Sequence, residues 1–422
     1  MIYIYSNKTS TRLNFILKFI FSEFLNSSYT LIHSKEDFNL VSGIKINYSN
    51  EEIESAIQII PHSLLFENDI KAQNINIDSA DHYKFFKTQN DDYGFDLFSA
   101  CFYLVSRYEE YLPHKKDEFG RFPSEESLAF KEGFLELPII DYWLNDFANR
   151  LKIKPDRNFK HQPIIDIDNA FAYLGKGFIR NSAAALKDVI QGRGITKRIN
   201  TLNKKQKDPF DTYDALQKIH QQFNCNPIYF VLVGNYGAYD KNVPFSSPEF
   251  KQAIKNLDGE IGIHPSYQSN QHPEKIKIEK ERLENITGKE VSISRQHYLK
   301  LNLPDTYNHL IDAGIKQDYS MAYPKHIGYR ASTSQPFHFF DLKENIEKPI
   351  LIHSTPIMDT TLNLHLKLNP KEAISEIIKI SEQAKSTKGN LFTCWHNETI
   401  SNFQNWENWQ EVYPKAMAQI HQ

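Results

Sequence analysis

The sequence predicts an α/β protein whose longer, C-terminal part is built from strands and intervening helices. Short apolar runs alternate there with amphipathic stretches, which is the order that βαβ units produce. The expected strands are 163–167, 227–233, 260–263, 291–294 and 390–394, and the clearest helices between them are 212–223 and 370–384. This pattern fits an α/β barrel or a doubly wound sheet, and in both folds ligands bind at the carboxyl ends of the strands.

A smaller segment of mixed α/β character precedes these units. Alternation and helical spacing predict one strand and three helices at 2–5, 10–25, 96–111 and 140–151. The next stretch, 152–163, is polar, basic and interrupted by prolines, which is typical of a connection between domains. Because 422 residues exceed one ordinary domain, we expect an N-terminal accessory domain over 1–155 and the main domain over 156–422.

The composition describes a globular protein without a strong overall charge. Apolar residues make up 40% of the chain and aromatic residues 13%, which is ample for buried cores. The formal net charge of -3 provides no broad positive field, so we expect no nucleic-acid partner. The densest basic stretch, 197–207, is interrupted by Asn and Gln and followed by Asp208 and Asp211. We interpret it as a solvated surface connection.

The cysteine and hydropathy patterns favour a cytoplasmic chain. The three cysteines are widely spaced and form no Cys-x-x-Cys pair, so we expect them to be reduced and mostly buried. No basic region precedes an apolar run at the N-terminus, and the most apolar stretch, 13–25, is interrupted by Asn, Lys, Ser and Glu. We therefore expect no signal peptide and no membrane span, with a cytoplasmic location as the working hypothesis.

Polar side chains follow the expected strands at the points where the strands end. Asp166 and Asp168 close the first strand, and their side chains share one face because residues two apart on a strand point the same way. Later strands end in His264, Arg295, His297 and His396. Each alone is more often a cap or a hydrogen-bonded structural residue. Together they predict a site, because α/β barrels collect catalytic groups from several strands at this face.

The order of these motifs resembles that of the polysaccharide deacetylases of carbohydrate esterase family four. The motifs that carry the resemblance are Asp166-Ile167-Asp168, the strand 229–234, Gly262-Ile263-His264, Arg295-Gln296-His297-Tyr298 and Trp395-His396. Two further segments, 106–122 and 328–342, look like those of a bacterial subgroup in which an additional domain precedes the catalytic one. The resemblance covers the chain well from Asp156 onward and more loosely before it.

The resemblance implies a distorted (β/α) barrel that binds one divalent metal ion and removes acetyl groups from N-acetylated sugars. Carried over position by position, it makes Asp166 the general base, Asp168 and His264 metal ligands, Arg295 the residue that orients Asp166, and His396 the general acid. The chemistry is coherent, because a divalent metal polarises an amide carbonyl and makes hydroxide available near neutral pH. A carboxylate can take the proton of water, and a histidine can protonate the leaving amine.

One position departs from the family pattern. The family usually has His-x-x-x-His, but Gln268 stands four residues after His264. Two ligands would hold a metal weakly, since catalytic sites usually provide three. His297 at the end of the neighbouring strand is the expected replacement and His272 a more distant one; alternatively, His297 only packs beside the substrate. Oxygen and nitrogen ligands suit zinc, cobalt, nickel or iron, and we expect zinc.

Several other residues are candidates for the walls of the site. The expected substrate-binding residues are Tyr267, Tyr298, Trp395 and Arg330. Aromatic rings stack on sugars, although in a chain this rich in aromatic residues they are usually core. The guanidinium could contact an anionic group, but an ion pair with Asp318 or Asp341 is the favoured interpretation. His353 and Asp359 follow another apolar run and could line the cleft.

Three functional hypotheses are open on the sequence alone. The first is a deacetylase with a carbohydrate substrate, and the second is a hydrolase of another small amide or cyclic ureide. The third is a glycan-binding or scaffold protein whose metal site has decayed, for which Gln268 is the motivating observation. Retention of Asp166 and His396, which only chemistry needs, counts against decay. The N-terminal segment could position substrate, recruit a partner or cover the barrel.

Overall fold

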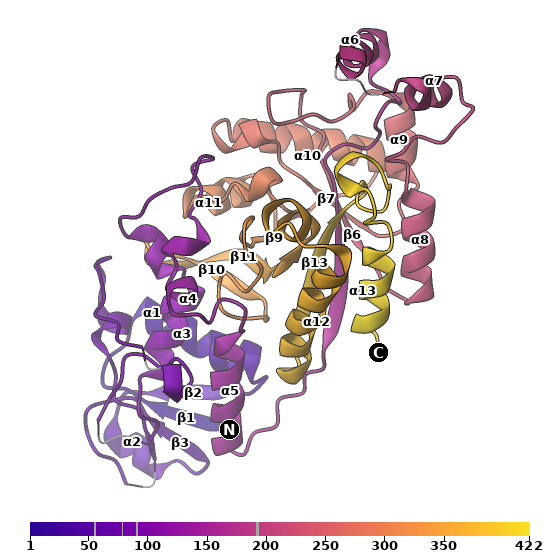
Figure 1. Ribbon diagram of the computed structural model, residues 1–422. Helices are drawn as coiled ribbons and strands as arrows, with labels where there is room; N and C mark the ends of the chain where they lie inside the picture. Colours follow the sequence, from indigo (N-terminus) through magenta and orange to yellow (C-terminus); the bar gives the residue numbers. More distant parts are fainter. Residues whose placement is uncertain (55, 78, 90–91, 191–193) are drawn as a thin grey trace.

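The fold contains two β-sheets with helices packed around them (Figure 1). The computed structural model describes residues 1–54, 56–77, 79–89, 92–190 and 194–422. A four-stranded sheet lies in the N-terminal part, and a nine-stranded sheet forms the centre of the C-terminal part. Within the described residues, no helix is both long and apolar enough to cross a lipid bilayer.

The strands and helices have the following bounds. The N-terminal sheet contains β1 (Ile2–Tyr5), β2 (Tyr29–Ile32), β3 (Ile44–Asn47) and β4 (Ile57–Gln58). The C-terminal sheet contains β5 (Lys160–Ile167), β6 (Ile228–Val231), β7 (Glu260–Ile263), β8 (Ile293–Ser294), β9 (Gln317–Met321), β10 (Phe337–Asp341), β11 (Ile346–Ser354), β12 (Ile357–Met358) and β13 (Asn390–His396). The helices of the N-terminal part are α1 (Thr11–Leu17), α2 (Lys35–Leu40), α3 (Leu97–Val105), α4 (Leu128–Lys131) and α5 (Ile139–Arg150). Those of the C-terminal part are α6 (Gly177–Ile190), α7 (Thr196–Leu202), α8 (Tyr213–Gln222), α9 (Pro248–Lys255), α10 (Glu274–Thr287), α11 (Asp305–Asp312), α12 (Pro370–Ser386) and α13 (Val412–Ile420).

The N-terminal sheet is parallel, with the strand order β2-β1-β3-β4. The helix expected at 10–25 begins where the side chain of Ser10 accepts a hydrogen bond from the backbone N–H of Leu13. It continues through α1 into the π-helical turn η1 (Lys18–Phe24). This continuous helix contacts β10 and β11 of the larger sheet. Because of these contacts, one apolar core runs through both parts of the molecule.

The C-terminal sheet is a curled half-barrel with the strand order β10-β11-β9-β8-β7-β6-β5-β13-β12. All neighbouring strands are parallel except β10, which is antiparallel to β11. The structure confirms the predicted α/β class with its distorted barrel. All five expected strands are present; β7 has the expected bounds, the other four have shifted ends, and β13 extends to His396. The division of the chain at residue 155 stays a prediction.

The strand register brings the polar strand ends together. Asp166 of β5 is paired with His396 of β13 on one side and with Phe230 of β6 on the other. Gly262 of β7 lies opposite Phe230 of β6, and a Cβ atom at position 262 would lie 2.5 Å from the Phe230 ring. A side chain at 262 would therefore push the strands apart. Since the strands are parallel, their carboxyl ends meet at one edge of the sheet.

A buried ion-pair cluster joins the N-terminal part to the half-barrel. Glu110 accepts hydrogen bonds from Nε of Arg107 at 2.8 Å and from Nε and Nη2 of Arg330 at 2.9 and 2.6 Å. Burial raises the pKa of Glu110, but Arg330 and Arg107 lower it more, so the pKa lies below the usual range. Arg330 thus pairs with Glu110 rather than with Asp318 or Asp341, which corrects the partner favoured from the sequence.

We expect Glu110→Ala to lower the free energy of unfolding by about 3–5 kcal/mol, because it leaves the buried guanidinium of Arg330 without a counter-ion and Arg107 with Glu109 alone. The measurement is chemical denaturation of both proteins. Glu290→Ala is the control, since the Glu290–Lys316 pair is exposed and its loss should cost less than about 1 kcal/mol. Equal effects of the two substitutions would show that the Glu110 cluster does not stabilise the contact between the two parts.

Candidate metal centre and active site

A pocket of about 350 Å³ opens at the carboxyl ends of the half-barrel strands. This volume is at the lower end of the range for small-molecule sites, which is about 300–1,000 Å³. Among the residues that line the pocket are Asp166, Asp168, His264, Arg295, His297, Tyr298 and His396. The N-terminal part contributes Arg121, which is buried, forms an ion pair with Asp117 and donates to the backbone oxygen of Tyr298. The accessory segment therefore forms part of the pocket wall.

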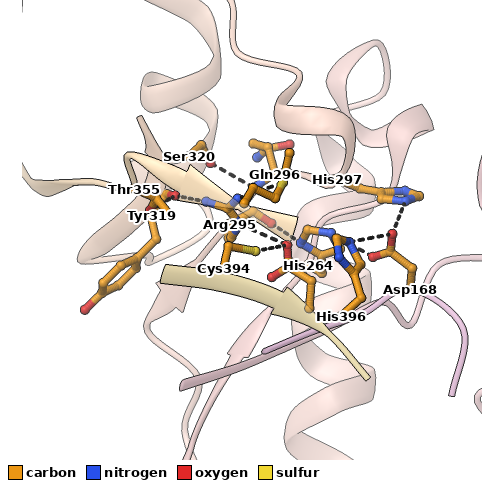
Figure 2. A network of polar contacts seen from close by, with 12 residues as sticks. Asp168, His264, Arg295, Gln296, His297, Tyr319, Ser320, Thr355, Cys394 and His396 are labelled. Atoms are coloured by element: carbon orange, nitrogen blue, oxygen red, sulfur yellow. Dashed lines mark hydrogen bonds and ion pairs between the residues drawn. The ribbon is translucent and has the colours of Figure 1, made fainter. Parts of the chain in front are cut away.

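Three side chains in the pocket form a group that can hold a metal ion. One oxygen of Asp168 and one ring nitrogen each of His264 and His297 lie within 4.8 Å of one another. Nε2 of His264 is 3.1 Å from Oδ1 of Asp168, and Nε2 of His297 is 3.3 Å from Oδ2. Figure 2 shows the rings and the carboxylate pointing toward one another. The other candidate, His272, instead lies at the surface beside Glu274.

The outer hydrogen bonds of both rings favour a cation at this position. Nδ1 of His264 contacts the backbone oxygen of Arg295, and Nδ1 of His297 lies 2.9 Å from Oδ1 of Asp240. These oxygen atoms can only accept, so each Nδ1 carries a proton, and Nε2 is the nitrogen that each ring directs toward Asp168. Burial lowers the pKa of His297, but Asp168 and Asp240 raise it to about 9. The raised pKa means that the two carboxylates favour a positive charge here. A carboxylate and two imidazoles fit a divalent ion such as zinc, which would supply this charge in place of a proton on His297.

Asp166 lies beside this group and is held by a buried arginine. Nε of Arg295 donates to Oδ2 of Asp166 at 2.9 Å, and Sγ of Cys394 lies 3.2 Å from the same oxygen. The other oxygen, Oδ1, is buried and has no hydrogen-bond partner in the described part of the chain. Burial raises the pKa of Asp166, but the Arg295 charge and two nearby histidines lower it more, so the pKa is below its usual value. The carboxylate is therefore ionised, with one oxygen able to accept a proton.

His396 also lies beside Asp168, and the buried carboxylate of Asp359 fixes its ring. Its Nδ1 is 2.8 Å from Oδ1 of Asp359, and its backbone N–H donates to Oδ2 at 2.7 Å. Nε2 lies 3.5 Å from Oδ2 of Asp168 and reaches the pocket. Burial lowers the pKa of His396, but Asp359 and Asp168 raise it above the usual value for histidine. The ring thus has a defined orientation, with Nε2 as the nitrogen available to a ligand.

Of the four expected substrate-binding residues, only Tyr298 lines the pocket, and Trp395 and Arg330 lie away from it. Trp395 is buried behind the sheet, where Nε1 donates to Oγ1 of Thr393 and the indole packs on Tyr413. Successive strand residues point to opposite faces, so Trp395 turns away where His396 turns inward. Arg330 lies in the ion-pair cluster with Glu110. Neither side chain is placed to contact a ligand in this pocket.

The two expected tyrosines lie together at the pocket. Tyr298 lines it, and Tyr267 packs against Tyr298 with ring centroids 5.5 Å apart. Tyr239, which the sequence did not single out, lines the pocket and lies 4.2 Å from Tyr267. His353, by contrast, is buried against Tyr319 and hydrogen-bonded to Gln317. The aromatic wall of the pocket therefore consists of tyrosines from loops.

From the sequence we did not identify three residues that belong to the site, namely Asp240, Glu398 and Arg121. Asp240 precedes no expected helix and ends no expected strand, so no local pattern indicates that it contacts His297. Glu398 lines the pocket, and burial raises its pKa to about 7. Its position two residues after His396 was a usable signal. Gln268, the departure from the family pattern, accepts a hydrogen bond from Lys275 and contributes nothing to the metal group.

A second group of metal-competent side chains lies at the opposite end of the strands. Nδ1 of His161 is 3.0 Å from Nε2 of His421, and Sγ of Cys225 is 3.3 Å from the same nitrogen. His161 is the second residue of β5, whereas Asp166 and Asp168 lie at its carboxyl end. Cys101 and Cys394 are buried and Cys225 is half-buried, which fits the expectation of mostly buried cysteines. This group is separate from the pocket.

Among protein families, the model of a family of unknown function (DUF7033) matches residues 2–155 of this chain. No curated protein matches the chain in sequence. Among solved structures, a protein assigned as a polysaccharide deacetylase from Mycobacterium smegmatis has 13% identity and a TM-score of 0.42, over 62% of this chain and 85% of that one. The polysaccharide deacetylase Bc1974 from Bacillus cereus has 12% identity and a TM-score of 0.32, over 62% and 86%. At this distance the likeness carries no information on activity.

We expect the purified chain to bind about one equivalent of zinc at this site, and the variants Asp168→Ala, His264→Ala and His297→Ala to lose it, because each removes one of three ligands. Elemental analysis after gel filtration measures the content. His272→Ala is the matched control, since it removes an exposed imidazole outside the group. Full metal content in His297→Ala would show that this ring only packs beside the site.

Proposed function

We propose that the chain is a metal-dependent hydrolase that removes acetyl groups from N-acetylated sugars. The supporting observation is that two differently held proton-transfer groups, Asp166 and His396, flank the metal-competent Asp168. Hydrolysis of an amide requires one group that takes a proton from water and another that gives a proton to the leaving nitrogen. A binding protein needs neither group in a fixed protonation state.

Asp166 is proposed as the general base. Arg295 occupies its Oδ2 and keeps the carboxylate charged, which leaves the unpartnered Oδ1 to accept the proton of an attacking water. Arg295 itself is fully buried and also donates to the backbone oxygen of Tyr319, so it holds Asp166 in one orientation. Arg295 is therefore a positioning residue and does not contact substrate in this scheme.

His396 is proposed as the general acid. Asp359 binds Nδ1, which fixes the tautomer and directs Nε2 toward the pocket, where it can protonate the leaving amine. Asp168, His264 and His297 would hold the metal, which when bound polarises the substrate carbonyl as a Lewis acid. Asp240 and the backbone oxygen of Arg295 keep the two imidazoles correctly oriented for that role.

The substrate class is proposed from the pocket wall and the motif resemblance. Tyr298 and Tyr239 provide aromatic faces beside the proton-transfer groups, and such faces pack against the apolar side of sugar rings. The pocket volume of about 350 Å³ is at the lower end of the range for small-molecule sites. We therefore expect an N-acetylated sugar unit, free or at the exposed end of a glycan precursor, to bind here.

We expect zinc-loaded protein to release acetate from N-acetylated oligosaccharides, and chelation to abolish the release until zinc is restored. The measurement is an enzyme-coupled acetate assay over a panel that also contains small amides and cyclic ureides. Turnover of the amides or ureides alone would contradict the sugar substrate and support the alternative hypothesis, a hydrolase of another small amide or cyclic ureide. Tight sugar binding without product from any substrate would support a glycan-binding protein.

Asp166→Asn should lower kcat by about 10²–10⁴-fold, because the amide cannot take the proton. Asp359→Asn should lower kcat by a similar factor, because an amide at this position no longer holds the proton on Nδ1 of His396 and so permits the wrong tautomer. Both variants should retain zinc, since neither residue belongs to the ligand group. Wild-type kcat in Asp166→Asn would contradict its role as base, whatever the activity of the other variant.

A further inference from the structure

Helices α6 and α7 turn their apolar side chains toward solvent. Phe178, Ile179 and Ile190 of α6 are 86%, 83% and 76% exposed, and Leu186 and Val189 are also exposed. At about 100° per residue, these five positions fall within roughly one third of the helix circumference and so form one face. Two apolar residues of α7, Ile199 and Leu202, are exposed as well. A surface helix of a globular protein normally shows the reverse arrangement, with its apolar face inward.

The polar faces of the same two helices hold them to the protein. Asn181 of α6 is buried and donates to the backbone oxygen of Tyr173. Arg198 of α7 is buried and donates to Oδ1 of Asn181 and to Asp188. The inversion is therefore specified by a set of buried polar contacts. Figure 1 shows α6 and α7 projecting from the half-barrel, on the side away from the N-terminal sheet.

The charge of this hairpin is strongly positive, in contrast to the chain as a whole. The sequence from Gly177 to Lys207 contains eight basic residues and one acidic residue, Asp188, whereas the whole chain has a formal net charge of -3. Asp188 is already bound by Arg198. Exposed lysines flank the apolar side chains at 187, 197, 204 and 205. The basic stretch near residue 200, interpreted from sequence as a solvated connection, thus borders an exposed apolar surface.

The base of α6 is attached to the wall of the pocket. The guanidinium of Arg180 donates to the backbone oxygens of Lys241 and Asn242 at 3.1 Å and stacks on Tyr236 at 4.1 Å. Lys241 lines the pocket, and Tyr236 is exposed. The first turn of α6 is therefore linked to a residue of the pocket wall.

We propose that the α6–α7 hairpin docks the protein on the surface of a lipid bilayer that contains anionic lipids. An inverted amphipathic helix with aromatic and aliphatic side chains outward and lysines at its margin has the chemistry of a peripheral membrane helix, which lies in the interface and does not span it. The lysines attract anionic headgroups, and the apolar face enters the boundary with the acyl chains. Docking is independent of the reaction in the pocket.

The experiment is co-sedimentation of the full chain with vesicles. We expect binding to vesicles of phosphatidylcholine and phosphatidylglycerol, and weaker binding to phosphatidylcholine alone or at high salt, because salt screens the lysines. Phe178→Ser/Ile179→Ser should lower the partition coefficient at least about tenfold, since two apolar side chains no longer enter the lipid. Lys204→Glu/Lys205→Glu should remove the preference for anionic vesicles.

Leu40→Ser is the matched control for the apolar substitution. Leu40 is 83% exposed, as Ile179 is, but belongs to α2 in the N-terminal part, so its loss should leave vesicle binding unchanged. Circular dichroism and the thermal midpoint should be the same for all variants, because the altered side chains are exposed. Failure of the wild type to sediment with anionic vesicles would overturn the proposal. A dimer that Phe178→Ser/Ile179→Ser dissociates, without vesicle binding, would overturn it in favour of a second copy of the chain.

Discussion

The attraction between one carboxylate, Asp168, and three imidazoles organises this end of the half-barrel. Nε2 atoms of His264, His297 and His396 lie within 3.1–3.5 Å of its oxygens. A partly exposed carboxylate in contact with three imidazoles is stabilised by a positive charge, either a proton on a ring or a cation between the ligands. Asp240 and Asp359 accept hydrogen bonds from the Nδ1–H groups of His297 and His396, so that Nε2 of each ring is the nitrogen that faces a cation or a substrate.

The parallel strands make this arrangement possible. Each strand ends at the same edge of the sheet, so single residues from distant parts of the sequence meet without long loops. The register of β5 and β13 sets Asp166 opposite His396, and Gly262 permits the close approach of β6 and β7. The N-terminal part completes the wall with Arg121 and is joined to the barrel by the Glu110 ion pairs. The barrel and the preceding segment thus build the pocket together.

Much of this could be predicted from the sequence, because strand ends carry a local signal. Apolar runs that stop at Asp166, His264 or His396 indicate both a strand and the edge at which it ends. The contribution of Asp240 could not be predicted, since it depends on where a long loop folds back. Arg330 and Trp395 were assigned to the ligand site because sequence gives residue type but not direction. The outward direction of the apolar face of α6 could not be predicted either, because hydrophobic periodicity identifies an apolar face but does not show whether other residues cover it.

The central claim is that Asp168, His264 and His297 bind a metal ion in the pocket. Anomalous diffraction at the zinc edge, from crystals grown with zinc, tests it most directly because it locates the ion. The claim predicts a peak about 2.0–2.2 Å from Nε2 of both histidines and from an oxygen of Asp168. A map without a peak there, or with one only at the His161–Cys225–His421 group, would contradict it.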